Sequence, residues 1–165
     1  AALDLNRSPH PALWIITWDP IQPVATRPLA IQKNGTWYTY GLDLTKNVCE
    51  VFGSTGYIAA AYTYTPFGEV SAKGAVTQPI LWSSEMRDGE LGMVYYNWRY
   101  FDTKYGRWNS RDHHETYANS CLYCYCKNNP LYYTDYLGLW FPKRHKDLTK
   151  DSIREIELKD NNKKI

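Results

Sequence analysis

The stretch Met93–Asp112, MVYYNWRYFDTKYGRWNSRD, places aromatic side chains at close intervals and passes through the turn sequence Asp102–Gly106. Tyrosine and tryptophan favour strands and half-buried surfaces, where the ring packs and its polar tip stays near water. We therefore expect a strand over Met93–Phe101, followed by a turn. The whole chain shares this bias, because its 165 residues include 15 Tyr and 7 Trp but only 4 Phe.

Similar segments lie upstream of this stretch. Asn34-Gly35 is a strong hairpin signal, and the aromatic and β-branched run Thr36–Tyr40 follows it. Further strands are expected at Val48–Phe52 and at Tyr57–Tyr64, and the second of these enters a turn at Thr65–Gly68. Turn signals at intervals of about 8–12 residues are typical of antiparallel β-structure. The sequence therefore predicts an all-β fold.

Length and charge exclude several classes of protein. A chain of 165 residues suits one core of ordinary size. Its 19 Lys and Arg oppose 17 Asp and Glu, and this near balance argues against a dedicated nucleic-acid binder. No apolar run reaches the roughly 18–20 residues that span a bilayer. Residues 140–165 are denser in charge, so we interpret them as a polar C-terminal extension, and the absence of an initial Met suggests a fragment of a longer chain.

Aromatic strands that enter a glycine turn recur along the chain, at Tyr38–Gly41, Tyr62–Gly68 and Tyr96–Gly106. These units resemble the tyrosine/aspartate-rich YD repeats of Rhs proteins. The stretch Ser83–Leu139 resembles, more specifically, the Rhs repeat-associated core domain. The pieces that carry this resemblance follow in order: Glu90–Tyr96, Arg99–Asp102, Gly106–Asp112, Leu122–Tyr125, Asn128–Pro130 and Asp135–Leu139.

The resemblance divides the chain into three parts. Residues 1–82 would be a YD-repeat-like segment of antiparallel β-hairpins, residues 83–139 the Rhs-associated core β domain, and residues 140–165 the charged extension. In Rhs proteins and the related C subunits of Tc toxins, YD-repeat strands form a hollow shell. The core domain plugs one end and cuts the chain after its terminal Gly-Leu motif, while the C-terminal piece, usually a toxin, stays inside.

The same resemblance implies a function for this chain. It implies a bacterial protein that is secreted or displayed at the cell surface, and whose partners are the rest of a shell or its own C-terminal peptide. Carried over by motif, the catalytic positions are Arg99, Asp112 and Asp135, and the scissile bond is Leu139–Trp140. The implied activity is a single-turnover, aspartic-type autoprotease that requires no cofactor.

Elementary chemistry supports a catalytic pair formed by the Asp112 and Asp135 carboxyl groups. Two carboxylates within about 6 Å of each other cannot both ionise easily, so they share a proton. One activates a water molecule while the other polarises or protonates the scissile carbonyl group. Arg99 can orient one carboxylate through a bidentate contact, and the tethered substrate needs no separate binding step. We therefore expect Asp112 and Asp135 to lie close together.

Other interpretations remain open at this stage. Family members usually carry proline where this chain has His113 and Tyr136, which favours a structural or interaction module that does not cut. Arg99 could instead stack on neighbouring aromatic rings. Asp102, which lies beside a turn, is expected to cap that turn.

The cysteines suggest a further alternative. Cys121, Cys124 and Cys126, with histidines nearby, supply soft ligands of the kind that bind zinc. On a strand, however, Cys124 and Cys126 would share one face and Cys121 the other, so we interpret them as strand cysteines and expect no metal. A disulfide bond is a further alternative if the protein is exported. Cys49 is the one cysteine outside this cluster that could pair with a member of it.

Overall fold

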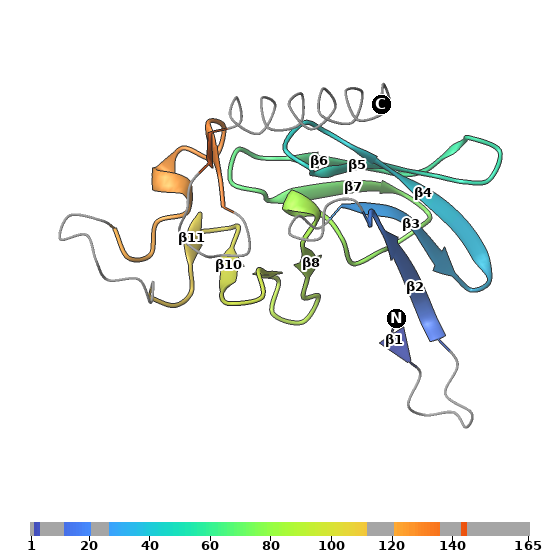
Figure 1. Cartoon of the computed structure of the whole chain (residues 1–165), viewed down its shortest axis with the longest axis horizontal. Coiled ribbons are helices and arrows are strands. Elements are labelled where there is room, and N and C mark those ends of the chain that lie inside the picture. Colours follow the sequence, from blue (N-terminus) through green and yellow to red (C-terminus); the bar gives the residue numbers. More distant parts are fainter. Residues whose placement is uncertain (1, 4–11, 21–26, 112–120, 136–142, 145–165) are drawn as a thin grey trace, which may run out of the picture.

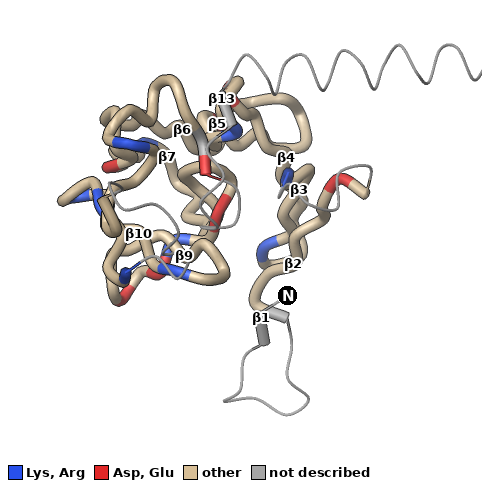
Figure 2. Tube along the Cα trace, turned by 60° about the vertical axis from the view of Figure 1, so that its left-hand side comes forward, with Lys and Arg blue, Asp and Glu red and all other residues tan. Residues whose placement is uncertain are grey.

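The computed structural model describes residues 2–3, 12–20, 27–111, 121–135 and 143–144. Within these residues the chain forms strands and two short 3-10 turns, so the predicted all-β fold is confirmed (Figure 1). The described part of the chain contains no helix that is long and apolar enough to cross a membrane. Lys and Arg are interspersed with Asp and Glu along it (Figure 2).

A seven-stranded antiparallel sheet, which we call the large sheet, follows the order of the sequence as a meander. Each strand pairs with the next along the chain, which is the simplest way to join antiparallel strands. Its strands are β1 Ala2–Leu3, β2 Ala12–Trp18, β3 Pro28–Lys33, β4 Thr36–Leu42, β5 Val48–Phe52, β6 Ile58–Tyr64 and β7 Val70–Gly74.

Two turns of the large sheet lie where the sequence predicts them, whereas the glycine turn expected at Gly41 is wrong, because Gly41 lies within β4 and pairs with Glu50 of β5. Asn34 and Gly35 join β3 to β4 with φ of 51° and 78°, the left-handed pair that a tight hairpin turn requires. Strand β5 has the predicted bounds, and β6 begins one residue later than predicted. The turn after β6 closes through a hydrogen bond from Thr65 N–H to the carbonyl group of Glu69, at 2.9 Å.

One face of the large sheet is buried and the other is largely open. Ile31, Val48 and Val51 are fully buried on this face. Ile80 and Leu81 pack in one cluster with Val48 and Val51. On the opposite face the side chain of Ile15 is exposed, as the period-2 alternation of a strand requires.

The second part of the molecule, which we call the site region, comprises the described residues between 82 and 135. Its four-stranded sheet has the order β11-β10-β9-β8. Two more strands form a separate pair, β12 with β13. The elements are η1 Trp82–Ser84, β8 Met86–Arg87, β9 Val94–Tyr95, β10 Tyr100–Asp102, β11 Arg107–Trp108, η2 Cys126–Asn128, β12 Tyr133–Thr134 and, beyond the site region, β13 Lys143–Arg144.

The single strand expected over Met93–Phe101 is wrong. A tight turn divides this stretch into β9 and β10, which pair with each other. Tyr96 N–H donates a hydrogen bond to the carbonyl group of Arg99 at 2.9 Å, and Asn97 takes a φ of 60°. Asparagine tolerates this left-handed conformation, so the turn forms within a run of aromatic residues that favours a strand by propensity.

The two parts lie side by side (Figure 1), and aromatic side chains make contacts between them. The rings of Tyr64 and Trp82 lie 5.6 Å apart. Gly106, at the turn between β10 and β11, faces Phe67, and a Cβ at this glycine would lie 2.8 Å from Cδ1 of that ring. Ser83 N–H also donates a hydrogen bond of 2.7 Å to Oδ1 of Asn47. The site region is therefore attached to the β4–β7 end of the large sheet.

Candidate functional site

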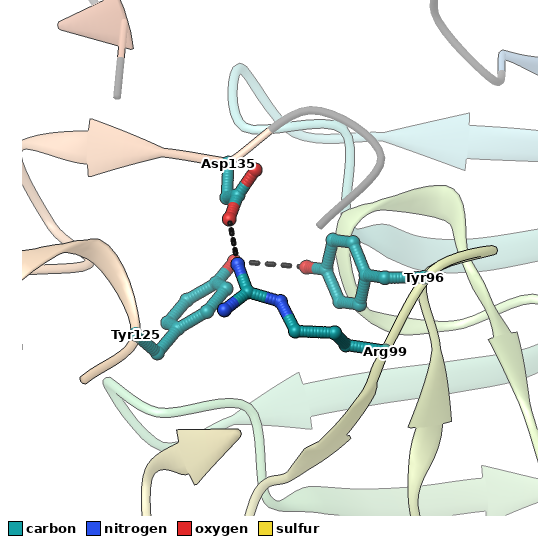
Figure 3. A network of polar contacts seen from close by, with 4 residues as sticks. All are labelled: Tyr96, Arg99, Tyr125 and Asp135. Carbon is teal, nitrogen blue, oxygen red and sulfur yellow. Dashed lines mark hydrogen bonds and ion pairs between the residues drawn. The ribbon is translucent and has the colours of Figure 1, made fainter. Parts of the chain in front are cut away.

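A buried ion pair joins two distant segments of the chain. Nη2 of Arg99 lies 3.5 Å from Oδ2 of Asp135 (Figure 3). Arg99 directly precedes β10, and Asp135 directly follows β12. The two side chains are only 2% and 3% exposed, so water screens their attraction far less than it would at a surface.

The Arg99 guanidinium group also lies on an aromatic ring. Its central carbon is 4.1 Å from the centroid of the Trp108 ring. Trp108 occupies β11 opposite Phe101 of β10, and this pairing brings the indole under the residue that precedes β10. The stacking interpretation of Arg99 is therefore confirmed, and the same side chain makes the ion pair as well. A cation–π contact of this kind restricts where the guanidinium group can point.

Four buried aromatic side chains belong to one cluster, which includes the Trp108 ring under Arg99: Tyr96, Phe101, Trp108 and Tyr125. The rings of Phe101 and Tyr125 stack at 4.0 Å, and Tyr96 meets Trp108 edge-on at 5.2 Å. The hydroxyl groups of Tyr96 and Tyr125 are hydrogen-bonded to each other at 2.8 Å. Burial raises the pKa of both tyrosines well above the usual value, so both hydroxyl groups stay protonated at neutral pH.

Cys126 contributes a buried thiol to the same place. The residue is 1% exposed. Burial raises the pKa of this thiol, and the negative charge of Asp135 raises it further. A thiol with a raised pKa stays neutral and weakly reactive. Its position beside Asp135 could not be derived from the sequence, because the segment that carries it folds as a turn.

Backbone conformation in this segment is unusual. Cys126, Lys127 and Asn128 have φ of 47°, 54° and 57°. Asn128 N–H donates to the carbonyl group of Tyr125 at 2.8 Å, so these residues form a left-handed turn. Left-handed backbone costs about 1–2 kcal/mol for each residue with a Cβ. The surrounding contacts must therefore hold the turn in place.

The interpretation of the three clustered cysteines as strand residues is wrong. Cys121 and Cys124 form a disulfide whose Cα atoms lie 5.3 Å apart. Cys124 N–H donates to the carbonyl group of Cys121 at 3.1 Å, so the chain turns here and brings the two thiols together. The partner is thus within the cluster, while Cys49 and Cys126 are free. Among the described residues, no three His, Cys, Asp or Glu side chains are grouped so that they could hold a metal ion.

Asp102 is a turn residue, as expected. Its carboxylate accepts hydrogen bonds from the backbone N–H groups of Lys104, at 3.0 Å, and Tyr105, at 3.2 Å. This local role explains why an aspartate follows the β10 aromatic residues without belonging to the ion pair.

The remaining predicted site residues lie outside the described part of the chain. These are Asp112, Leu139 and Trp140, together with His113 and Tyr136, which replace the prolines of the family pattern. The closeness of Asp112 to Asp135 and the position of the scissile bond therefore stay predictions. Of the three predicted catalytic residues, the structure describes Arg99 and Asp135, and these two are in contact.

No family model and no curated protein matches this chain in sequence. Solved structures do match it. The Tc holotoxin pore of Photorhabdus luminescens with a mutated TccC3 subunit aligns at 26% identity and a TM-score of 0.60, over 68% of this chain and 5% of the matched chain. The TcdB2-TccC3 complex without its hypervariable C-terminal region aligns at 25% identity and a TM-score of 0.60, over 67% and 6%.

A third structure, TcdB2-TccC3-TEV, aligns at 25% identity and a TM-score of 0.62, over 76% of this chain and 6% of the matched chain. The present chain thus corresponds to about one-twentieth of the length of the proteins it matches. The all-β fold and the ordered aromatic strands are consistent with these likenesses. The chain is related in fold to the Tc and Rhs toxin proteins.

Proposed function

We propose that this chain is the end-closing part of a bacterial Rhs/Tc-type shell, and that it cuts its own backbone once, between Leu139 and Trp140. The observation that carries the proposal is the buried Arg99–Asp135 ion pair. A resemblance based on sequence pieces alone assigns these two residues to one site, and the fold brings them together. Residues 1–82 would belong to the shell wall, residues 83–139 to the plug and residues 140–165 to the released segment.

In this mechanism Arg99 fixes the carboxylate of Asp135 at the site, while the Trp108 ring fixes Arg99. Asp112 supplies the second carboxylate, and the two share one proton. The ionised carboxylate takes a proton from water, whose oxygen attacks the carbonyl carbon of Leu139. The other carboxyl group donates a proton to the nitrogen of Trp140 as the C–N bond breaks. Tethering keeps the substrate at hand.

The likeness to TcdB2-TccC3 complexes supports the assignment of a shell as partner. One of those complexes is described as lacking a hypervariable C-terminal region, and residues 140–165 follow the core-like stretch of this chain in the same order. Location outside the cytoplasm, by secretion or at the cell surface, is part of the same proposal.

Intact-mass spectrometry of the freshly purified protein tests the cut. We expect fragments that end at Leu139 and begin at Trp140, and their loss in Asp112→Asn and in Asp135→Asn. Asp102→Asn is the matched control, because asparagine can still cap the turn and the residue lies outside the ion pair. This control should cut as fast as the unchanged protein.

Each outcome needs a check of folding, because loss of one partner of a buried ion pair is strongly destabilising. Near-ultraviolet circular dichroism shows whether a variant retains its aromatic packing. An uncut but folded unchanged protein would contradict the protease, and so would a folded Asp135→Asn variant that still cuts.

A structural plug that does not cut is the second candidate. The observation that favours it is again the ion pair: contact with Arg99 accounts by itself for the burial of Asp135. In this second function, the Arg99–Asp135 ion pair anchors the last segment of the core-like stretch 83–139. An uncut, folded chain is then the expected result.

A further inference from the structure

We propose that the Cys121–Cys124 disulfide is a positioning element of the Arg99–Asp135 site, and that a dithiol which reduces it loosens that site. Only the effect on backbone cleavage rests on the function proposed above. The effect on the packing of the site concerns described residues alone and can be measured whether or not the chain cuts itself.

The first step is the contact between the disulfide turn and β11. Cys124 forms a β-bridge with Arg107. Trp108 N–H donates a hydrogen bond of 2.9 Å to the carbonyl group of Tyr123, which lies inside the disulfide-closed turn. Trp108 is the residue whose ring lies under the Arg99 guanidinium group. The disulfide therefore acts on Arg99 through the strand that carries its aromatic support.

The second step leads from the same turn to Asp135. Tyr125 follows the disulfide directly and stacks on Phe101 at 4.0 Å, while its hydroxyl group contacts that of Tyr96 at 2.8 Å. Figure 3 shows both hydroxyl groups with the ion pair. Cys126 comes next, buried beside the Asp135 carboxylate. Both members of the ion pair are thus connected to the disulfide turn within a few residues.

The third step is the left-handed turn at Cys126–Asn128, which lies between these two anchors. Three consecutive left-handed residues are unfavourable by themselves. The disulfide holds the chain before these residues. The Arg99–Asp135 ion pair, at the end of β12, holds the chain after them. When one anchor is released, the strain favours opening of the segment, and local opening of this kind is common where few regular backbone bonds exist.

The disulfide is placed where a thiol can reach it. Cys121 is exposed, whereas Cys126 is fully buried. A thiolate of a dithiol attacks Sγ of Cys121, forms a mixed disulfide and releases the Cys124 thiolate. The second thiol of the reductant then displaces Cys121 and closes its own disulfide. Two electrons pass to the protein, whose disulfide becomes two thiols, and the dithiol is oxidised.

The experiment measures how fast iodoacetamide alkylates two thiols in the folded protein, by mass spectrometry of peptides. Cys126 reports on the site, and Cys49, which is half-buried on β5, reports on the large sheet. In the Cys121→Ser/Cys124→Ser variant we expect alkylation of Cys126 to rise by at least about tenfold, because local opening exposes it. Alkylation of Cys49 should change by less than about twofold.

The unchanged protein provides the reversible form of the same test. Reduction with dithiothreitol should raise the alkylation rate of Cys126, and re-oxidation before labelling should restore the slow rate. An unchanged Cys126 rate in the reduced protein would overturn the proposal. A parallel rise at Cys49 and Cys126 would overturn it as well, because it would show general unfolding rather than a local effect.

Cleavage provides a separate arm. In a protein that cuts, the reduced form should cut several-fold more slowly than the oxidised form. Faster alkylation of Cys126 with an unchanged rate of cutting would contradict the positioning role. A chain that cuts in neither form contradicts the proposed protease, and the comparison of Cys126 with Cys49 still decides whether the disulfide holds the site together.

Discussion

The large sheet and the site region reach stability in different ways. Strands β2–β7 have five to seven residues each and pair in sequence order. The stability of this sheet is therefore distributed over many similar contacts. In the site region the strands have two or three residues. Here a stacked aromatic cluster, a disulfide, left-handed turns and one buried ion pair replace long ladders. We infer that stability in the site region depends on a few contacts.

This difference matters for function. A short-stranded region can hold charged groups and irregular backbone that a regular ladder would exclude, since a buried charge needs a partner at a fixed place. The large sheet supplies Tyr64 at the end of β6 and Phe67 in the β6–β7 turn, against which Trp82 and Gly106 pack. The comparison predicts that single substitutions of polar groups have larger effects in the site region, while apolar substitutions matter in both.

The largest effect is expected from the ion pair. Arg99→Met should lower the free energy of unfolding by about 3–5 kcal/mol, because it leaves the Asp135 carboxylate buried without its cation. Urea unfolding followed by tryptophan fluorescence measures this. Arg107→Met on the exposed side of β11 is the matched control, and we expect it to change stability by less than about 0.5 kcal/mol.

A double variant sharpens the interpretation. Arg99→Met combined with Asp135→Leu removes both charges, so it should recover part of the lost stability. Equal stability of Arg99→Met and Arg107→Met would show that the ion pair does not hold the site region together, and the contrast with the large sheet would then fail.

The large sheet should respond most to loss of its apolar core. Ile31→Ala is expected to lower the free energy of unfolding by about 3 kcal/mol, because Ile31 is fully buried in β3 and the change leaves a cavity. Ile15→Ala on the open face should lower it by less than about 1 kcal/mol, since 38% of that residue is already exposed. Chemical denaturation compares the two variants. Equal effects would show that the core does not lie on the face of the sheet that carries Ile31.

Three strands of the large sheet could be predicted from local patterns. Asn34-Gly35 demanded a left-handed turn, and the β-branched and aromatic runs on either side of such turns formed the predicted strands β4, β5 and β6. Strands β1, β2, β3 and β7 were not identified from the sequence. Strand β7, for example, has one β-branched residue and no aromatic residue, so its propensity for a strand is weak. Local physics suffices where a strand carries a run of β-branched or aromatic residues.

The site region could be predicted only in part. Arg99 and Asp135 were assigned to one site by resemblance to known motifs, since no periodicity links residues on separate short elements. The turn at Tyr96–Arg99 was hidden by aromatic residues that favour strands. The Cys121–Cys124 disulfide was missed because the cysteines were placed on a strand, where their side chains would diverge. Tertiary contacts, not propensity, decide these conformations.

A hydroxyl group should matter more in the site region than in the large sheet. Tyr125→Phe removes the acceptor of Trp82 Nε1–H and a partner of the Tyr96 hydroxyl group, both buried, so we expect a loss of about 2 kcal/mol. Tyr40→Phe removes a half-buried bond to Oε1 of Gln78, which still accepts from Ile80 N–H. Its loss should be below about 1 kcal/mol. Thermal unfolding of both variants compares them, and a larger loss at Tyr40 would reverse the comparison.

The smallest effect concerns a turn of the large sheet. Gly35 has a φ of 78° and no atom near its would-be Cβ, so Gly35→Ala isolates the conformational penalty, which we expect to be about 1 kcal/mol. Gly89→Ala is the matched control, because Gly89 is equally open but its φ is not in the left-handed region. That control should be neutral or slightly stabilising. Urea midpoints distinguish the two variants. A neutral Gly35→Ala would mean that the β3–β4 turn can adopt another geometry, and that the regular part of the molecule tolerates local change even more readily than its long ladders suggest.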